Sequence, residues 1–358
     1  MKTLPPVNWT GIMLLLVGLV LLPVSDVMSQ RWPRRCCPPP PCCCRPIATH
    51  YQGWNVQPPQ PRWAGPAVSY AWQHAPSVAV PAPSKLQALI VDGQNNHGNW
   101  PQTSQMMKSY LEESGLFEVD VTTTAPRGID EHFAPEFSKY DVVVSNYNGE
   151  PWLEDTQNAF EHYMKNGGGF VTVHAADNAF PDWPEYNEMI GLGGWGGRNQ
   201  ANGPWVYYNA ETGEVVRDNA EGPGGHHGRQ HDFRIIVRDS EHPVTRGMPG
   251  AWMHVKDELY DKLRGPANNM QILATAFADP ETGGSGRHEP MIFTIEYGEG
   301  RVFHLPLGHS NESQMCTGFI TTFLRGAEWA ASGKVSQPIP DDFPTMDATR
   351  SREFATGE

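Results

Sequence analysis

The feature that most constrains this chain of 358 residues is a regular alternation of short apolar segments with helical patterns between Leu86 and His174. Residues 86–91 form an apolar run with the length of a buried strand, and further strands are expected at 117–122, 141–145 and 170–174. Pro101 begins one helical pattern and Gly115 ends it, while a second pattern spans about residues 154–166. Strands that alternate with helices at this spacing predict an α/β fold with a parallel, doubly wound sheet.

The second half of the chain predicts further elements of the same domain after a long glycine-rich insertion at residues 191–232. We expect a strand at 234–238, a hairpin formed by 290–297 and 301–305, and a last helix over about 313–331. Cys316 falls within that helical pattern and is expected to be a small core residue.

Composition divides the chain into four parts. They are a signal peptide over 1–29, a Pro/Cys-rich disordered tether over 30–84, the α/β domain over 85–335, and a polar, flexible tail over 336–358. Residues 30–84 hold 13 of the 33 prolines and five of the six cysteines. Proline at that density cannot build a hydrogen-bonded core, and the cysteine spacing matches no zinc template. The segment is therefore expected to act as a spacer.

The first 29 residues have the features of an export signal. Lys2 supplies a positive start, and residues 11–22 form an apolar run shorter than the roughly 20 residues that span a bilayer. Val27 and Ser29 stand at the −3 and −1 positions of a cut before Gln30. We expect export to the periplasm or cell envelope, either after cleavage or with this segment kept as an uncleaved N-terminal anchor.

The charge distribution argues against nucleic acid as a partner. The net charge is −14, residues 1–29 are neutral and residues 30–84 carry +5, so residues 85–358 carry −19. A domain this acidic is repelled by a phosphate backbone and by an anionic lipid surface.

Polar side chains follow three of the predicted strands at their carboxyl ends. They are Asn95 and His97 after the first strand, Asn146 and Asn148 after the third, and His174, Asp177 and Asn178 after the fourth. Ligands of doubly wound sheets bind beyond these strand ends. Turn chemistry alone explains asparagine and aspartate there, but it explains His97 and His174 less easily. Apart from His174, we expect these residues to bind substrate.

The glycine-rich insertion adds candidates of two kinds. Trp195 could stack on the apolar face of a sugar, although loops also use tryptophan for packing. His226, His227 and His231 form a histidine cluster that could hold a divalent metal such as zinc. The stretch is flanked by glycine, so the alternative is a loop that covers the pocket.

Four segments in a fixed order resemble the trehalose-utilisation (ThuA-like) family. They are Leu89–His97, Gly167–His174, Asp257–Tyr260 and Gly300–His309. The resemblance covers about residues 86–332. It implies a fold similar to the class I glutamine amidotransferase domain, which is a flavodoxin-like, doubly wound, mostly parallel sheet. It also implies metabolism of trehalose or related disaccharides through 3-keto sugars, with a sugar oxidoreductase as a partner in the same pathway.

The ends of these motifs supply the candidate catalytic residues, which are His174, Glu258, His309 and Asp257. Imidazole transfers protons near neutral pH and binds divalent metals, and Glu258 could act as a general base or as a metal ligand. The alternative is that the histidines are structural and bonded to nearby carbonyl groups.

The chain departs from the amidotransferases at one decisive place. Their nucleophilic cysteine lies in the sharp turn after a central strand, whereas the corresponding turn here begins at His174 and contains no cysteine. Glutamine amidotransfer is therefore not expected. The first loop also lacks the Gly-x-Gly-x-x-Gly pattern of NAD-binding domains.

Three functions follow from these observations. The first is an exported enzyme that acts on a disaccharide or keto-sugar by hydrolysis, isomerisation or related acid/base chemistry. The second is a non-catalytic carbohydrate-binding module tethered at the cell envelope. The third is a structural envelope protein linked through its cysteine-rich segment. The polar strand ends favour the first two.

Overall fold

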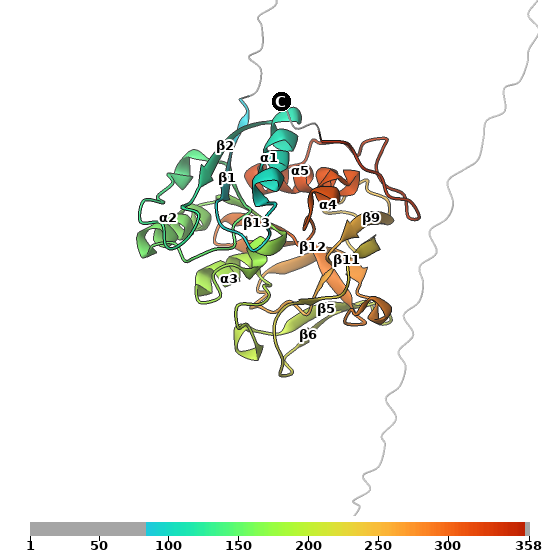
Figure 1. The fold of residues 1–358 in the computed structure, drawn as a ribbon. Helices are drawn as coiled ribbons and strands as arrows, with labels where there is room; N and C mark the ends of the chain where they lie inside the picture. Colours follow the sequence, from blue (N-terminus) through green and yellow to red (C-terminus); the bar gives the residue numbers. More distant parts are fainter. Residues whose placement is uncertain (1–83, 355–358) are drawn as a thin grey trace, which may run out of the picture. The chain divides into compact units, whose positions relative to one another are not determined.

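A computed structural model of the chain describes residues 84–354 (Figure 1). The predicted signal peptide and the predicted tether up to residue 83 lie outside the described residues. No helix among residues 84–354 is long and apolar enough to cross a membrane.

The first half of the central sheet is parallel. Its strands, in spatial order, are β2 (Phe117–Thr123), β1 (Leu86–Asp92), β3 (Val142–Ser145), β4 (Gly169–Val173) and β13 (Gly300–Leu305). All four neighbouring pairs run parallel. Parallel strands need crossover connections, and α-helices supply those from β1 to β2 and from β3 to β4.

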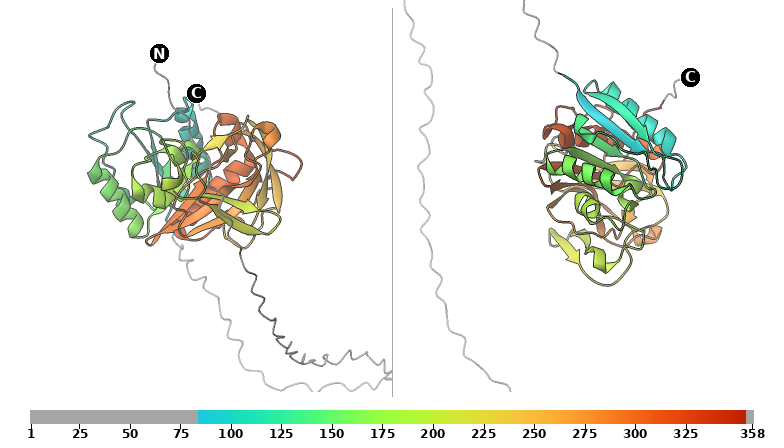
Figure 2. Two further views of the ribbon diagram at one scale, coloured as in Figure 1. Left: turned by 90° about the horizontal axis from the view of Figure 1, so that it is seen from below. Right: turned by 90° about the vertical axis from the view of Figure 1, so that its left-hand side faces the viewer.

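Helices cover both faces of this half (Figures 1 and 2). On one face lie α1 (Trp100–Glu113) and α5 (Thr317–Ser332), and on the other lie α2 (Glu154–Lys165) and α3 (Pro184–Ile190). Alternate residues of β1 enter the two cores, because successive side chains of a strand point to opposite faces. The predicted α/β, doubly wound fold is confirmed.

The sheet continues beyond β13 as an antiparallel half. Its strands are β12 (His288–Tyr297), β11 (Met270–Phe277), β8 (His231–Val237) and β9 (Ala251–Asp257). Each of these strands reverses the direction of its neighbour. Consequently β9 runs in the same direction as β13, and its carboxyl end lies at the same edge of the sheet as those of the parallel strands.

The glycine-rich insertion contains more structure than the loop expected from its composition. It holds the hairpin of β5 (Trp205–Asn209) and β6 (Glu214–Asp218), which joins the sheet through β12. It also holds β7 (His226–His227), which pairs with β10 (Tyr260–Asp261) in a separate small sheet. Four 3₁₀ turns complete the described elements; they are Phe137–Lys139, His174–Asn178, Gln200–Asn202 and Pro280–Thr282.

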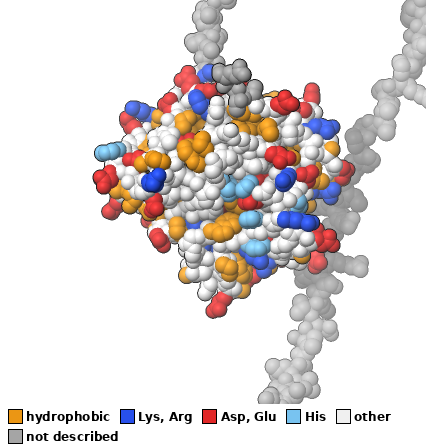
Figure 3. Space-filling view, in the orientation of Figure 1, with side chains coloured by type: hydrophobic (Ala, Val, Ile, Leu, Met, Phe, Trp, Pro, Cys, Tyr) orange, Lys and Arg blue, Asp and Glu red, His pale blue; other side chains and the backbone are white. Residues whose placement is uncertain are grey.

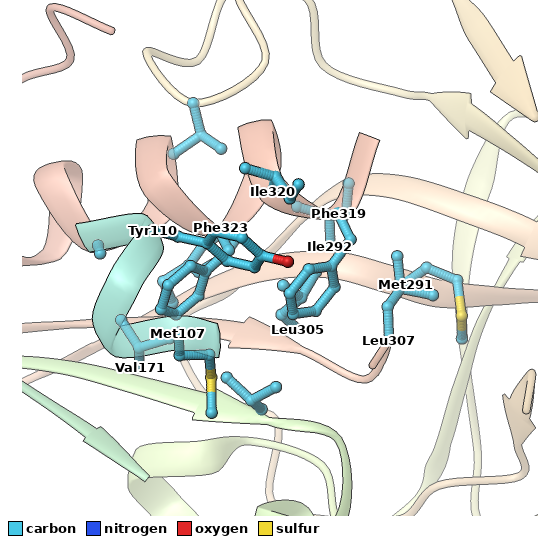
Figure 4. Close-up of a cluster of buried hydrophobic side chains, with 14 of the residues drawn as sticks. Met107, Tyr110, Val171, Met291, Ile292, Leu305, Leu307, Phe319, Ile320 and Phe323 are labelled. Carbon is cyan, nitrogen blue, oxygen red and sulfur yellow. The ribbon is translucent and has the colours of Figure 1, made fainter. Parts of the chain in front are cut away.

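The core between α1, α5 and the sheet is closely packed (Figure 4). Met107 and Tyr110 of α1 meet Phe319 and Phe323 of α5 above Leu305 of β13, and all five side chains are buried. Gly326 lets α5 approach the sheet closely, because a Cβ atom at this position would stand 2.1 Å from the ring of Phe303. Native packing leaves no room for that overlap.

The structure differs from the sequence-based expectations near the C-terminus. The single helix expected over 313–331 is broken at Cys316 into α4 (Asn311–Met315) and α5. The thiol of Cys316 is buried, as expected.

The tail over 336–358, expected to be flexible, packs against the domain over residues 336–354. Phe343 is buried in the core, and the backbone at Ser351 bridges to Cys316. The Glu328 carboxylate accepts hydrogen bonds from the backbone of Ser336 and Gln337. Polar composition suggested mobility here, but these hydrogen bonds hold the segment to α5.

Candidate active site

Four loops at one edge of the sheet bring three imidazoles and one carboxylate together. His97 follows β1, His174 follows β4, Glu258 follows β9 and His309 follows β13. We call these four residues the His/Glu cluster. Parallel strands end at a common edge, and the direction of β9 adds its own end to that edge.

The carboxylate lies between the three imidazoles. Glu258 Oε2 stands 3.1 Å from Nδ1 of His309, 3.6 Å from Nε2 of His174 and 4.0 Å from Nε2 of His97. One donor atom from each member lies within 4.8 Å of all the others. The other oxygen, Oε1, accepts a hydrogen bond of 3.2 Å from Nε2 of Gln230.

The backbone directs His174 into the cluster. Its φ is +46°, a left-handed conformation that non-glycine residues rarely adopt and that is typically held at functional sites by the surrounding structure. Nδ1 lies 2.8 Å from the carbonyl oxygen of Pro306 and therefore donates its proton there. Nε2 faces the cluster and accepts a 2.8 Å hydrogen bond from the hydroxyl of Tyr260.

Electrostatics act differently on the members of the cluster. Burial lowers the pKa of His174, but Glu258, Asp257 and the carbonyl of Pro306 raise it more, so a metal that binds there would displace a proton. Burial, together with the charges of His174 and His309, lowers the pKa of His97 to about 4. Burial raises the pKa of Glu258, but the neighbouring imidazoles of His174 and His309 outweigh burial and hold that pKa well below the usual range. His97 is therefore neutral and Glu258 ionised near neutral pH, as metal ligation requires.

A pocket of about 430 Å³ opens above the cluster. It is lined by Asn96, His97, Asn148, Gly149, Asn178, Phe180, Pro181, Trp195, Gly196, His227, Glu258 and Tyr260. The rings of Trp195 and Tyr260 stand 4.7 Å apart and give the pocket an aromatic wall. Figure 3 shows histidine side chains gathered near the middle of one face of the molecule, with hydrophobic side chains beside them.

Comparison with known proteins identifies the family. A family model described as trehalose utilisation, ThuA, matches residues 87–330. The chain belongs to the ThuA family. That description associates the chain with carbohydrate metabolism and with a small sugar as its ligand.

Two solved structures of ThuA-like proteins are similar to this chain. The one from Parabacteroides merdae is 49% identical in sequence, with a TM-score of 0.73, and the match covers 75% of this chain and 98% of that chain. The one from Bacteroides uniformis is 20% identical, with a TM-score of 0.48, over 72% of this chain and 96% of that chain. No curated protein matches.

The His/Glu cluster of this ThuA-family chain could hold a divalent metal ion. Ligands that stand about 2.1 Å from a tetrahedral zinc ion lie about 3.4 Å from one another. Glu258 Oε2 is 3.1–4.0 Å from the three imidazole nitrogens, so the geometry fits with small adjustments. Three imidazoles and one carboxylate suit zinc and other first-row divalent metals.

The structure brings some of the predicted substrate-binding residues to the pocket and leaves others behind it. Asn148, Asn178 and Trp195 line the pocket, as does His97 of the cluster. Asn95, Asn146 and Asp177 do not.

Each of the three residues behind the pocket has a different bonding role. Asn95 accepts the backbone N–H of His97 at 2.9 Å and so orients that histidine. Asn146 is buried and donates to the hydroxyls of Thr103 and Ser104 in α1. Asp177 is fully buried, 3.4 Å from Nε2 of His304.

The three histidines predicted as metal ligands in the insertion are not brought together. His226 Nδ1 bonds to Asp261 at 2.8 Å, and His231 Nδ1 bonds to the carbonyl of Arg229 at 2.9 Å. His227 instead faces the pocket, with Nε2 3.8 Å from Glu258 Oε1. Among residues 84–354, the His/Glu cluster is the one group of three or more histidine, cysteine, aspartate or glutamate side chains whose donor atoms converge as metal ligands would.

Sequence reasoning did not single out Tyr260, Asn96 or Gln230 as site residues. Tyr260 bonds to His174, Asn96 accepts a 2.7 Å hydrogen bond from Asn148, and Gln230 bonds to Glu258. Tyr260 is the last residue of the third family motif and Asn96 directly precedes His97, so the sequence offered a reason to consider both as site residues. Gln230 had none.

Proposed function

We propose that this protein is a sugar-processing enzyme that converts a neutral disaccharide or keto-sugar in the pocket above the His/Glu cluster. The observation that carries the proposal is the convergence of three imidazoles and an ionised carboxylate from four strand ends at the base of an aromatic-walled pocket. Hydrolysis and isomerisation both need polarisation of a carbonyl or hydroxyl group and a proton transfer, which this combination can supply.

We propose that the cluster holds a divalent metal, with zinc as the first candidate. His97, His174, His309 and Glu258 would be its ligands. When bound, such an ion polarises a sugar carbonyl and lowers the pKa of a bound water. The low pKa of Glu258 supports the ligand role, because a carboxylate so readily ionised is a weak general base.

The pocket lining supports an uncharged sugar as the substrate. Of the described residues that line it, none is lysine or arginine, the usual partners of phosphate and carboxylate groups. The amides of Asn96, Asn148 and Asn178 can bond to sugar hydroxyls, and Trp195 can stack on the apolar face of a pyranose ring.

The decisive experiment is product analysis by NMR with the full-length chain. Trehalose, other disaccharides and their 3-keto forms are incubated with the protein, with and without chelator, and after reloading with Zn²⁺. Glu258→Gln is the test variant. Glu289→Gln is the matched control, because Glu289 is another buried carboxylate that does not line the pocket.

Each outcome of this experiment has a clear meaning. A new sugar product that disappears with chelator and with Glu258→Gln supports the proposal. Saturable sugar binding without any product supports the carbohydrate-binding module instead. Conversion of the 3-keto forms alone would support a partner oxidoreductase, since another enzyme must then oxidise the sugar first.

We further propose that the protein acts outside the cytoplasm. The support is the apolar run at residues 11–22, followed by the predicted cleavage site before Gln30. Expression of the full chain in a Gram-negative bacterium, followed by fractionation and mass spectrometry, tests this. Periplasmic protein that begins at Gln30 is expected, and uncleaved cytoplasmic protein would contradict it.

A further inference from the structure

A fully buried carboxylate joins two of the loops that form the His/Glu cluster. Asp257 has no exposed surface and does not line the pocket. Its Oδ1 accepts the backbone N–H groups of Glu258 at 2.9 Å and His309 at 3.1 Å, and its Oδ2 accepts that of Gly308 at 2.8 Å. One side chain thus holds the backbones of Glu258 and His309, which are 51 residues apart in the sequence.

A second buried side chain orients this carboxylate. His254 lies on β9, is fully buried, and its Nε2 donates to Oδ2 of Asp257 at 2.8 Å. Burial lowers the pKa of His254, but Cys316 and Asp257 raise it more, to about 10. The imidazole is therefore charged near neutral pH and forms an ion pair with Asp257. A buried ion pair of this kind, with Asp257 bonded to His254 and to three backbone N–H groups, can restrict a site to one arrangement.

We propose that His254 and Asp257 are positioning residues that set the separation of Glu258 and His309 for metal binding. This inference rests on the proposed metal-binding role of the cluster. Neither residue contacts the pocket, so neither is placed to touch a substrate. Their four hydrogen bonds hold Glu258 Oε2 and His309 Nδ1 at 3.1 Å, near the separation that two ligands of one metal ion need.

The geometry distinguishes this role from simple packing. A side chain that only filled space at position 254 could be replaced by another of similar volume. A positioning residue must also donate a hydrogen bond to Asp257. Glutamine at position 254 can donate through its amide, whereas leucine has a similar volume and no donor.

Co²⁺ binding to the full-length chain, followed by visible absorption, tests the proposal. The parent protein for all variants carries serine in place of the five cysteines outside the described residues, so that their thiols cannot bind Co²⁺. These cysteines are Cys36, Cys37, Cys42, Cys43 and Cys44. The variants are His254→Leu, His254→Gln and Asp257→Asn, with Glu289→Gln as the control. Thermal unfolding of each metal-free protein establishes that it folds.

We expect His254→Leu and Asp257→Asn to weaken Co²⁺ binding by about 10- to 100-fold and to shift the absorption bands, as loss of outer-shell partners does. His254→Gln is expected to stay within about threefold of the parent, because the donor to Asp257 remains. Glu289→Gln is expected to bind like the parent.

Two results would overturn the inference in distinguishable ways. If the parent binds Co²⁺ and the His254→Leu and Asp257→Asn proteins bind it equally well with unchanged spectra, the positioning role is wrong and the proposed metal site stands. If the parent itself does not bind, the metal site and this inference fail together. Should His254→Leu not fold, His254→Gln is compared with His254→Asn, whose shorter amide cannot reach Asp257.

Discussion

Removal of the Glu258 charge should abolish stabilisation of the protein by metal. Zinc at about 100 times its dissociation constant stabilises a folded protein by about 2.7 kcal/mol. The described part of the chain has about 270 residues, and an unfolding entropy of about 2.1 cal/mol/K per residue gives about 0.57 kcal/mol/K. The melting temperature of the parent should therefore rise by about 5 °C on addition of zinc.

The Glu258→Gln protein should show almost none of this rise. Loss of an outer-shell partner alone costs up to about 100-fold in metal affinity, so loss of a direct ligand should cost at least as much. At the same zinc concentration the stabilisation then falls to about 0.4 kcal/mol, which is a shift below about 1 °C.

Differential scanning calorimetry of the full-length chain in the serine background measures both shifts. Each protein is compared with and without zinc, so any change that the substitution makes to the metal-free stability cancels. Glu289→Gln should show the full shift of the parent. A full shift in Glu258→Gln, or none in the parent, would refute the reasoning.

Three further predictions concern the protein around the cluster. Burial, reinforced by Asp261, raises the pKa of Glu289 to about 7, so the parent should lose stability as the pH rises from about 4.5 to 7. Glu289→Gln should remove that dependence and be about 3 kcal/mol more stable than the parent at pH 8, as urea denaturation across pH would show. Arg198 is buried and donates hydrogen bonds to the backbone carbonyls of Asn178 and Gly194 beside the pocket. Arg198→Lys should lower the free energy of unfolding, measured by urea denaturation, by about 3 kcal/mol. A loss below about 1 kcal/mol would contradict this role. Trp195→Ala should weaken sugar binding by about tenfold in calorimetric titration, and unchanged affinity would exclude stacking on this ring.

The parallel half of the fold could be predicted because three of its strands, β1, β3 and β4, are buried on both faces and appear in the sequence as short apolar runs. The edge strand β2 is exposed on one face and alternates apolar and polar residues instead. The strand β9 could not be recognised in this way. It carries the buried His254, which bonds to Asp257, and the exposed Lys256, so its apolar pattern is interrupted twice.

The candidate site was predicted in part, and the errors have a physical cause. His226 and His227 were grouped because they are neighbours in sequence, but neighbouring residues of a strand point to opposite sides. In β7 one of them bonds to Asp261 and the other faces Glu258. Contacts over long sequence separations, such as the hydrogen bonds that the loop after β13 donates to Asp257, leave no pattern in a single sequence.

The arrangement of the site separates the proposed metal ligands from the proposed sugar-binding wall. The cluster is built from strand ends of the central sheet, and its members are held by hydrogen bonds that they donate to the carbonyl of Pro306 and the carboxylate of Asp257. Trp195 and His227 instead come from the glycine-rich insertion, which crosses the pocket without contributing a member of the cluster. Substitutions in the insertion can therefore change which sugar is bound while the imidazoles keep their positions. Substitutions at Asp257 should have the opposite effect and weaken metal binding before they alter the pocket.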